Sequence, residues 1–305
     1  MMVPPPNQRF ENMGSISNSG ENNAGIFLEW DAHSREYCIE KRLKARDVRN
    51  GYAQREIELL IQLQGHPNIA NLVAYDYNYP EFGRPSAKIW THYCDHRSLD
   101  NVIEALKVSK TRAPEAFLWH VFEGLAEAVR HCQQGPQGYD GPWNTVYHRD
   151  IKPSNVFLAS TQTENEFPRV VLGDFGCSTS TYHVRNGFND EQFCSIQDLN
   201  FVPPEAPKYT LRSDIYQIGI VLYCLMFAQL EPCSEWNVML SDILHQDVWL
   251  RELRSDRPYS LALVRLVSKC LTRKVDQRLG IGELTQRIVS RARECSASDV
   301  LFDNY

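Results

Sequence analysis

The chain has 305 residues, of which 43% are hydrophobic and 23% are charged, as expected for a globular protein with a full core. Its net charge of -6 gives no general reason to expect nucleic acid or an anionic membrane as partner. The nine cysteines are scattered and never form a paired C-x-x-C spacing, which argues against a zinc site and is typical of reduced intracellular thiols.

The first 24 residues are rich in Pro, Asn, Ser and Gly and hold few apolar side chains. Such a composition predicts a mobile tail, with ordered structure beginning near Gly25. Prolines stand where a signal peptide would need an apolar core, and the basic amphipathic character of a transit peptide is missing. The longest apolar run, residues 218–230, is short for a bilayer span and predicts a buried helix. We therefore expect a protein of the cytoplasm or nucleus.

Strand patterns come first along the chain, and helical patterns follow. Residues 25–30 and 36–43 are β-rich runs separated by turn-like residues, which predicts an antiparallel pair. Apolar residues at helical spacing predict a helix over residues 52–63 that stops at Gly65. Further helices are predicted over residues 113–132, 213–229, 261–272 and 281–294.

Two long loops interrupt the helical part, at residues 133–145 and 177–200. Loops of that length inside a compact domain are usually functional or mobile. The order of the elements predicts an α+β chain in which a small strand-rich lobe precedes a larger helical lobe.

Two motifs form a constellation suited to phosphoryl transfer. Residues 148–155 read His-Arg-Asp-Ile-Lys-Pro-Ser-Asn, and residues 170–176 read Val-Val-Leu-Gly-Asp-Phe-Gly. Phosphoryl transfer needs carboxylates for magnesium, a cation for phosphate and an acceptor for the substrate's hydroxyl proton. Magnesium prefers hard oxygen ligands, which Asp174 and the amide of Asn155 can supply from two adjacent loops.

These motifs resemble those of the eukaryotic protein kinase superfamily, over a stretch from about Gly20 to Leu284. The resemblance implies a bilobal kinase fold, with a disordered tail over residues 1–19, a small antiparallel-sheet lobe over residues 20–93 and a mainly helical lobe over residues 94–305. It implies ATP and Mg²⁺ as cofactors and a protein as substrate. The sequences of the motifs, such as Lys-Pro-Ser-Asn-Val-Phe-Leu, are similar to those of the NIMA-related branch.

The same resemblance implies roles for individual residues. Asp150 would accept the hydroxyl proton, Lys152 would contact the transferred phosphate, and Asn155 and Asp174 would hold the metal ions. A lysine two residues after Asp150 implies the Ser/Thr class rather than the tyrosine class.

Other landmarks follow in the family's order along the chain. Glu56 matches the helix glutamate that pairs with the phosphate-binding lysine. Residues 91–94 look like the gatekeeper and hinge, which implies nucleotide contacts for His92 and Cys94. In the second lobe, the family's Ala-Pro-Glu corresponds to Pro203, Pro204 and Glu205, its glutamate's arginine partner to Arg278, and its central-helix pattern to Asp214 and Gly219.

The Gly-rich loop departs from the family pattern. Its best placement puts Gly20, Asn22 and Gly25 at the three glycine positions. Backbone N–H groups must approach the phosphates closely there, so Asn22 implies a looser cradle. The alternative is that these are turn residues in a polar tail.

The strand after the Gly-rich loop raises a sharper question. The family's Val-Ala-Ile-Lys falls on residues 37–40, which puts Glu40 in the lysine's place and Lys41 next to it. Side chains alternate across a strand, so only one of the two can face the cleft unless a bulge intervenes. A carboxylate about 4 Å from a phosphate charge is unfavourable by about 4 kcal/mol at an effective dielectric of about 20.

An active enzyme therefore needs Glu40 turned away and another cation paired with Glu56. Our hypothesis is that Lys41 replaces the usual lysine, with Arg42 and Lys44 as other candidates. A third departure lies at Gln197-Asp198, where the family usually has Gly-Thr. Asp198 could favour basic residues in a peptide substrate, or it could simply face solvent.

Two functions remain open from the sequence. The first is an active Mg-ATP-dependent Ser/Thr protein kinase, because every residue of the catalytic and metal loops is present. The second is a pseudokinase that serves as a scaffold or binding module, suggested by Glu40, Asn22 and Asp198 together. A kinase-fold enzyme for small molecules is disfavoured by the protein-kinase framework of Glu205 and Arg278.

Overall fold

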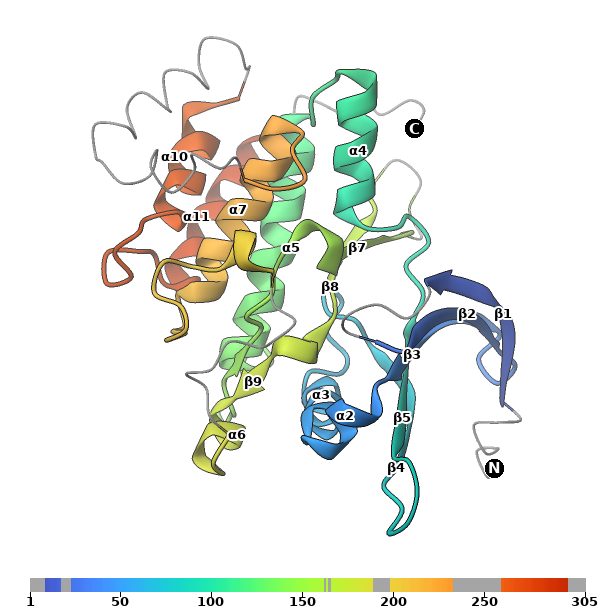
Figure 1. Cartoon of the computed structure of the whole chain (residues 1–305). Coiled ribbons are helices and arrows are strands. Elements are labelled where there is room, and N and C mark those ends of the chain that lie inside the picture. Colours follow the sequence, from blue (N-terminus) through green and yellow to red (C-terminus); the bar gives the residue numbers. More distant parts are fainter. Residues whose placement is uncertain are drawn as a thin grey trace.

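The structure is a computed structural model that describes residues 9–17, 23–161, 163, 166–188, 198–232 and 259–295. A small sheet-rich lobe is followed by a larger helical lobe (Figure 1). The two-lobed α+β fold predicted from the sequence is therefore confirmed. Gly20, Asn22 and Gln197 lie outside the described residues, as do residues 1–8 of the predicted tail.

The small lobe is built on one antiparallel sheet with the strand order β1-β2-β3-β5-β4. The predicted pair appears as β2 and β3, which are joined by a short turn. The five strands are β1 (Phe10–Ser17), β2 (Gly25–Asp31), β3 (Glu36–Leu43), β4 (Leu72–Asn78) and β5 (Ser86–His92).

Strand β1 corrects the expectation of a disordered tail. It pairs with β2, so the tail expected over residues 1–19 is wrong for residues 10–17, and the small lobe begins before residue 20. Phe10 stacks on Trp90 of β5 with ring centroids 4.7 Å apart, and Arg9 donates two hydrogen bonds to Asp31. The other seven residues of the strand are exposed, so it lacks the apolar alternation that identifies a strand in a sequence.

Two helices follow β3 in the small lobe, α2 (Ala45–Arg49) and α3 (Tyr52–Gln62). Gly51 precedes α3 with φ 76°, a left-handed conformation that glycine adopts without strain. The predicted helix over residues 52–63 matches α3 to within one residue. Its buried face carries Glu56 toward the short η2 helix (Phe175–Cys177) of the other lobe.

The large lobe surrounds helix α7, in which every residue from Ser213 to Met226 is buried. An apolar helix buried on all sides is what the run at residues 218–230 predicted. Helices α4, α5 and α10 pack against α7, and α11 packs against α5 (Figure 1). These helices are α4 (Leu99–Ser109), α5 (Glu115–Gln134), α7 (Ser213–Phe227), α10 (Leu261–Cys270) and α11 (Ile281–Cys295).

Short elements between α5 and α7 carry the loops at the junction of the lobes. They are β6 (Val146–Tyr147), η1 (Pro153–Asn155), β7 (Val156–Ala159), β8 (Arg169–Leu172), η2, β9 (Thr179–Ser180), α6 (Thr181–Arg185) and η3 (Leu199–Phe201). Helix α6 lies within the predicted 177–200 loop. Within the described ranges, no helix has both the length and the apolar character that crossing a bilayer requires.

Candidate active site

The side chains of Glu40 and Lys41 on strand β3 point to opposite faces of the sheet. The register is continuous, with Ile26 opposite Lys41 and Phe27 opposite Glu40, so no bulge disturbs the alternation. The one-residue ambiguity of the sequence is thereby decided. Lys41 lies on the face toward α3, and Glu40 lies on the other face.

Lys41 joins the two lobes through two carboxylates. Its Nζ lies 2.7 Å from Glu56 Oε1 on α3 and 2.7 Å from Asp174 Oδ1, which immediately precedes η2. Burial lowers the pKa of Lys41, but the charges of Asp174 and Glu56 outweigh burial and hold the pKa above its ordinary value. The side chain of Lys41 is therefore a fixed cation between two anions.

The two carboxylates of this cluster respond differently to burial. Burial raises the pKa of Glu56, and the charge of Lys41 only partly opposes this effect. Burial also acts to raise the pKa of Asp174, but Lys41 and the backbone N–H of Gly176 outweigh it and hold the pKa below the usual range. The surroundings of Asp174 thus favour its ionised form, which a metal ligand requires.

Glu40 is held on the far face of the sheet by cations of its own. It is 1% exposed and forms ion pairs with Arg42 and with Lys88, whose Nζ lies 3.0 Å from Glu40 Oε2. The neighbouring Glu29 accepts a 2.8 Å hydrogen bond from Trp90 Nε1. The charge that would repel a phosphate is thus directed away from the cleft and neutralised within the sheet.

The catalytic-loop residues predicted from the sequence lie together. Lys152 Nζ is 3.0 Å from Asp150 Oδ2, and the Asn155 amide nitrogen donates to the same oxygen at 3.0 Å. Asp150 Oδ1 is buried and has no hydrogen-bond partner within the described structure. Burial raises the pKa of Asp150 to about 6, with Lys152 acting in the opposite direction. An unsatisfied carboxylate oxygen of this kind is a ready acceptor for a hydroxyl proton.

Helix α7 anchors the catalytic loop, residues 148–155, through Asp214. The Asp214 carboxylate accepts hydrogen bonds from the backbone N–H groups of His148 (3.0 Å) and Arg149 (2.9 Å). Arg149 has φ 71°, a conformation that costs energy for a residue other than glycine. The two hydrogen bonds stabilise this turn, and the turn sets the position of Asp150.

Asp174 and Asn155 fit a magnesium ion bound together with a nucleotide. The Asn155 nitrogen bonds Asp150, so the amide oxygen is the atom that can bind a cation. No group of three or more His, Cys, Asp or Glu side chains suited to a metal occurs in the described ranges. Magnesium usually takes only one or two protein ligands and completes its shell with phosphate oxygens and water, so two ligands are sufficient.

Three further residues predicted to contact the nucleotide lie at the start of β2, at the end of β5 and two residues beyond it. Gly25 opens β2 with φ 138°, and a side chain there would meet the ring of Phe27 at 2.7 Å. His92 ends β5 with an exposed imidazole whose Nδ1 is 3.4 Å from Glu36 Oε2. Cys94 is partly buried, and burial raises the pKa of its thiol to about 11, so it is an uncharged thiol at neutral pH.

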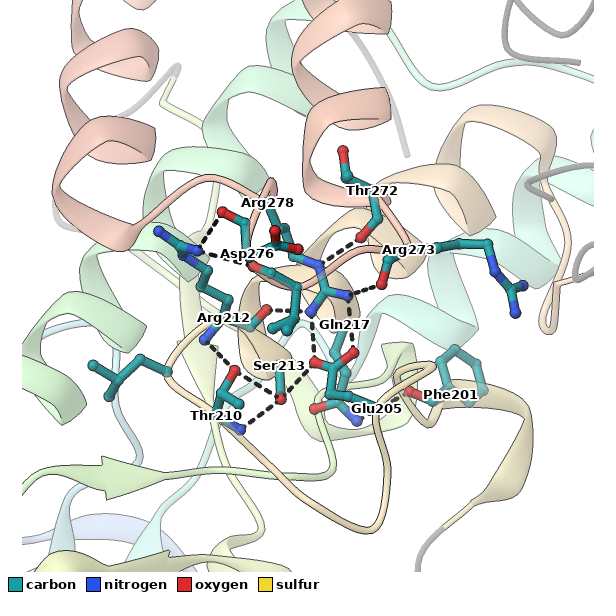
Figure 2. A network of polar contacts seen from close by, with 12 residues as sticks. Phe201, Glu205, Thr210, Arg212, Ser213, Gln217, Thr272, Arg273, Asp276 and Arg278 are labelled. Carbon is teal, nitrogen blue, oxygen red and sulfur yellow. Dashed lines mark hydrogen bonds and ion pairs between the residues drawn. The ribbon is translucent and has the colours of Figure 1, made fainter. Parts of the chain in front are cut away.

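A second polar network anchors the segment that follows residue 198 (Figure 2). The Arg278 guanidinium is fully buried and pairs with Glu205 through two contacts of 2.6 and 2.9 Å. Ser213 Oγ donates to the same Glu205 carboxylate at 2.7 Å. The predicted pair of Glu205 and Arg278 is thus present.

One buried polar residue of this network was not among the sequence candidates. Gln217 of α7 contacts the catalytic loop. It also donates to the carbonyl oxygen of Phe201 in η3 (Figure 2). The only sequence signal was a lone amide in an otherwise apolar helix. Such a residue is usually hydrogen-bonded in the core, but its partners cannot be read from the sequence.

The two-lobed fold and the paired loops at its cleft are those of the protein kinase class. Residues 22–289 match the protein kinase domain family, so the chain belongs to that family. It is 32% identical over 203 residues to the G2-specific protein kinase nimA of Emericella nidulans, covering 58% of this chain and 26% of that protein.

Two further relatives show the range of the similarity. The chain is 30% identical over 187 residues to the serine/threonine-protein kinase Nek2 of Mus musculus, covering 60% of this chain and 38% of that protein. It is 28% identical over 273 residues to the CBL-interacting serine/threonine-protein kinase 12 of Arabidopsis thaliana, covering 86% of this chain and 49% of that protein. The chain spans about half the length, or less, of these relatives. The similarity to the NIMA-related branch is confirmed.

Proposed function

We propose that this chain is an active protein serine/threonine kinase that transfers the γ-phosphate of ATP to hydroxyl groups of a protein substrate. The observation that carries the proposal is the pairing of Lys41 with Glu56 and Asp174 across the cleft, beside a complete catalytic loop. Two of the relatives, Nek2 and the CBL-interacting kinase 12, are named serine/threonine-protein kinases, which supports the same substrate class. We also propose the cytoplasm or nucleus as its compartment.

Each residue has a distinct role in this proposal. Lys41 would bind the nucleotide's phosphates while Glu56 holds it in place. Asn155 and Asp174 would hold Mg²⁺, which when bound neutralises the charge of the phosphates. Gly20 and Gly25 would flank the phosphate cradle, and the segment from His92 to Cys94 would lie against the base.

The transfer itself would be organised by Asp150 and Lys152. The substrate's hydroxyl oxygen forms a bond to the γ-phosphorus as its proton passes to Asp150. The bond between the γ-phosphorus and the bridging oxygen breaks, and ADP departs with the electron pair. Lys152, whose Nζ is 3.0 Å from Asp150 Oδ2, would stabilise the oxygens of the phosphoryl group as it is transferred.

A pseudokinase would keep this fold without transferring phosphate. The orientation of Glu40 weighs against this alternative, because the carboxylate is paired with Arg42 and Lys88 away from Lys41. The other two reasons for it, Asn22 and Asp198, concern the predicted nucleotide loop and the substrate segment rather than the identity of the phosphate-binding lysine.

The test is a phosphotransfer assay with radiolabelled ATP, Mg²⁺ and a library of Ser/Thr peptides. We expect transfer by the wild type and a loss of about a hundredfold or more in Asp150→Asn, which has the same shape but cannot accept the proton in the same way. Equal transfer by both proteins would indicate a contaminating kinase. No transfer by folded wild type that is nevertheless stabilised against heat by Mg-ATP would establish the pseudokinase instead.

A further inference from the structure

Gln217 is a polar residue buried in the middle of the apolar helix α7. Its exposed fraction is 0%, and its neighbours along the helix are also fully buried. Burying an amide without hydrogen bonds costs free energy, so the partners of Gln217 decide why it is tolerated.

All three hydrogen bonds of the Gln217 amide go to backbone atoms of two different loops. Oε1 accepts from the N–H of Ile151 at 3.1 Å. Nε2 donates to the carbonyl oxygens of Arg149 (3.0 Å) and Phe201 (3.1 Å). The amide therefore uses both hydrogens on the loops and bonds no side chain.

The two loops are those that the transfer reaction must align. Arg149 and Ile151 flank Asp150 directly in the catalytic loop. Phe201 belongs to η3, which begins after Asp198. Figure 2 shows Gln217 pointing toward Phe201, next to the network of Glu205 and Arg278. The Gln217 amide thereby joins Phe201 of η3 to Arg149 and Ile151 of the catalytic loop.

We propose that Gln217 is a positioning residue that fixes the substrate-facing segment around η3 relative to Asp150. The proposal rests on the proposed kinase activity. Asp214, one turn earlier on α7, bonds only the catalytic loop through His148 and Arg149. Gln217 is different because it joins the catalytic loop to the segment around η3. The two segments therefore keep a fixed position relative to each other during transfer.

The test compares Gln217→Met with Val221→Ala in the full chain. Methionine has a similar length but forms none of the three hydrogen bonds. Val221 is 0% exposed, lies one turn further along α7 and serves as a matched control for loss of stability. We expect Gln217→Met to lower kcat/KM for the peptide about tenfold, with KM for ATP within about twofold of wild type, and Val221→Ala to preserve both.

A second variant covers the case in which Gln217→Met does not fold. Gln217→Glu keeps the shape and the acceptor for Ile151, but places an oxygen opposite the carbonyls of Arg149 and Phe201. Its peptide kcat/KM should fall at least as far as that of the methionine variant. Wild-type transfer by either folded variant, or an equal loss in Val221→Ala, would overturn the proposal.

Hydrogen exchange gives a readout that does not depend on activity. The amide of Ile151 should exchange about tenfold faster in Gln217→Met than in Val221→Ala, since only the methionine variant removes its acceptor. An unchanged exchange rate would refute the coupling of the loops. Absence of transfer by wild type with faster exchange in Gln217→Met would instead refute the kinase activity and leave the coupling intact.

Discussion

Each face of strand β3 buries a cluster of charged side chains, but the two clusters differ in net charge. On one face, Lys41 lies between two carboxylates, so the cluster carries one excess negative charge. On the other face, Glu40 and the adjacent Glu29 are accompanied by two cations, Arg42 and Lys88. The unbalanced cluster lies between the two lobes, where a divalent cation can complete it, whereas the balanced cluster needs nothing further. We infer that the first face serves function and the second serves stability.

The largest effect should come from removing the cation on the cleft face. Lys41→Met should lower the rate of phosphate transfer about a thousandfold, because about 4 kcal/mol of attraction to a phosphate charge is lost. The measurement is kcat/KM with ATP as the varied substrate, normalised to the folded fraction from circular dichroism. A folded Lys41→Met protein with wild-type activity would contradict the inference that the Lys41 face serves function.

Removing the charge on the opposite face should affect stability instead. Glu40→Ala leaves Arg42 and Lys88 without their buried partner, but both are about one third exposed and can regain water. We therefore expect a loss of about 2 kcal/mol in the free energy of unfolding, below the value for a fully buried pair. Urea denaturation measures this loss, and transfer by the folded variant should stay within about twofold of wild type.

The pair of Arg9 and Asp31 adds a dependence on pH to the same face. The hydrogen bonds from Arg9 hold the pKa of the Asp31 carboxyl well below its usual range. A depressed pKa stabilises the fold above the ordinary carboxyl pKa of about 3.9, and this contribution is lost as the pH falls toward the lowered value.

The variant Arg9→Met should therefore cost about 1.5 kcal/mol of unfolding free energy at neutral pH. The difference from wild type should shrink when the pH falls below about 4. Denaturation at a series of pH values checks this. A difference that is constant over the whole series would show that the contribution of Arg9 comes from packing over Phe10 rather than from the charge of Asp31.

The smallest effect should come from Trp90→Phe. The substitution removes the hydrogen bond to Glu29 but keeps an aromatic ring for Phe10 to stack on. We expect a loss of about 1 kcal/mol in unfolding free energy. Phosphate transfer should not change, and a change of more than about twofold would connect this face to the active site after all.

The sequence predicted much of the fold because its elements carry strong local patterns. Strand β3 begins and ends where predicted, and α7 and α10 begin at their predicted first residues, Ser213 and Leu261. Strand β1 could not be predicted, since its stability comes from pairing with β2 and from contacts of Phe10 with Trp90, which lies far away in the chain. Polar composition alone argued for a tail there.

The candidate site was likewise predicted only in part. Asp150, Lys152 and Asn155 are brought together as their motif suggested, because a short loop fixes their spacing. The Asp174 loop is joined to them by the hydrogen bond from the Gly173 N–H to the Asn155 carbonyl. The choice between Glu40 and Lys41 depended on the strand register and on which cations surround each face, and neither is a local property. Gln217 could not be predicted as a link between loops, because all of its partners are backbone groups.

The most direct test of the account labels lysines with an acyl phosphate of ATP, which acylates lysines close to the bound phosphates. Peptide mass spectrometry would follow Lys41 and Lys88, which lie on opposite faces of the sheet. We predict that Lys41 is labelled and that excess Mg-ATP suppresses this labelling, whereas any labelling of Lys88 is the same with and without ATP. Suppression at Lys88, or no ATP-dependent change at Lys41, would contradict the assignment of the Lys41 face to the nucleotide.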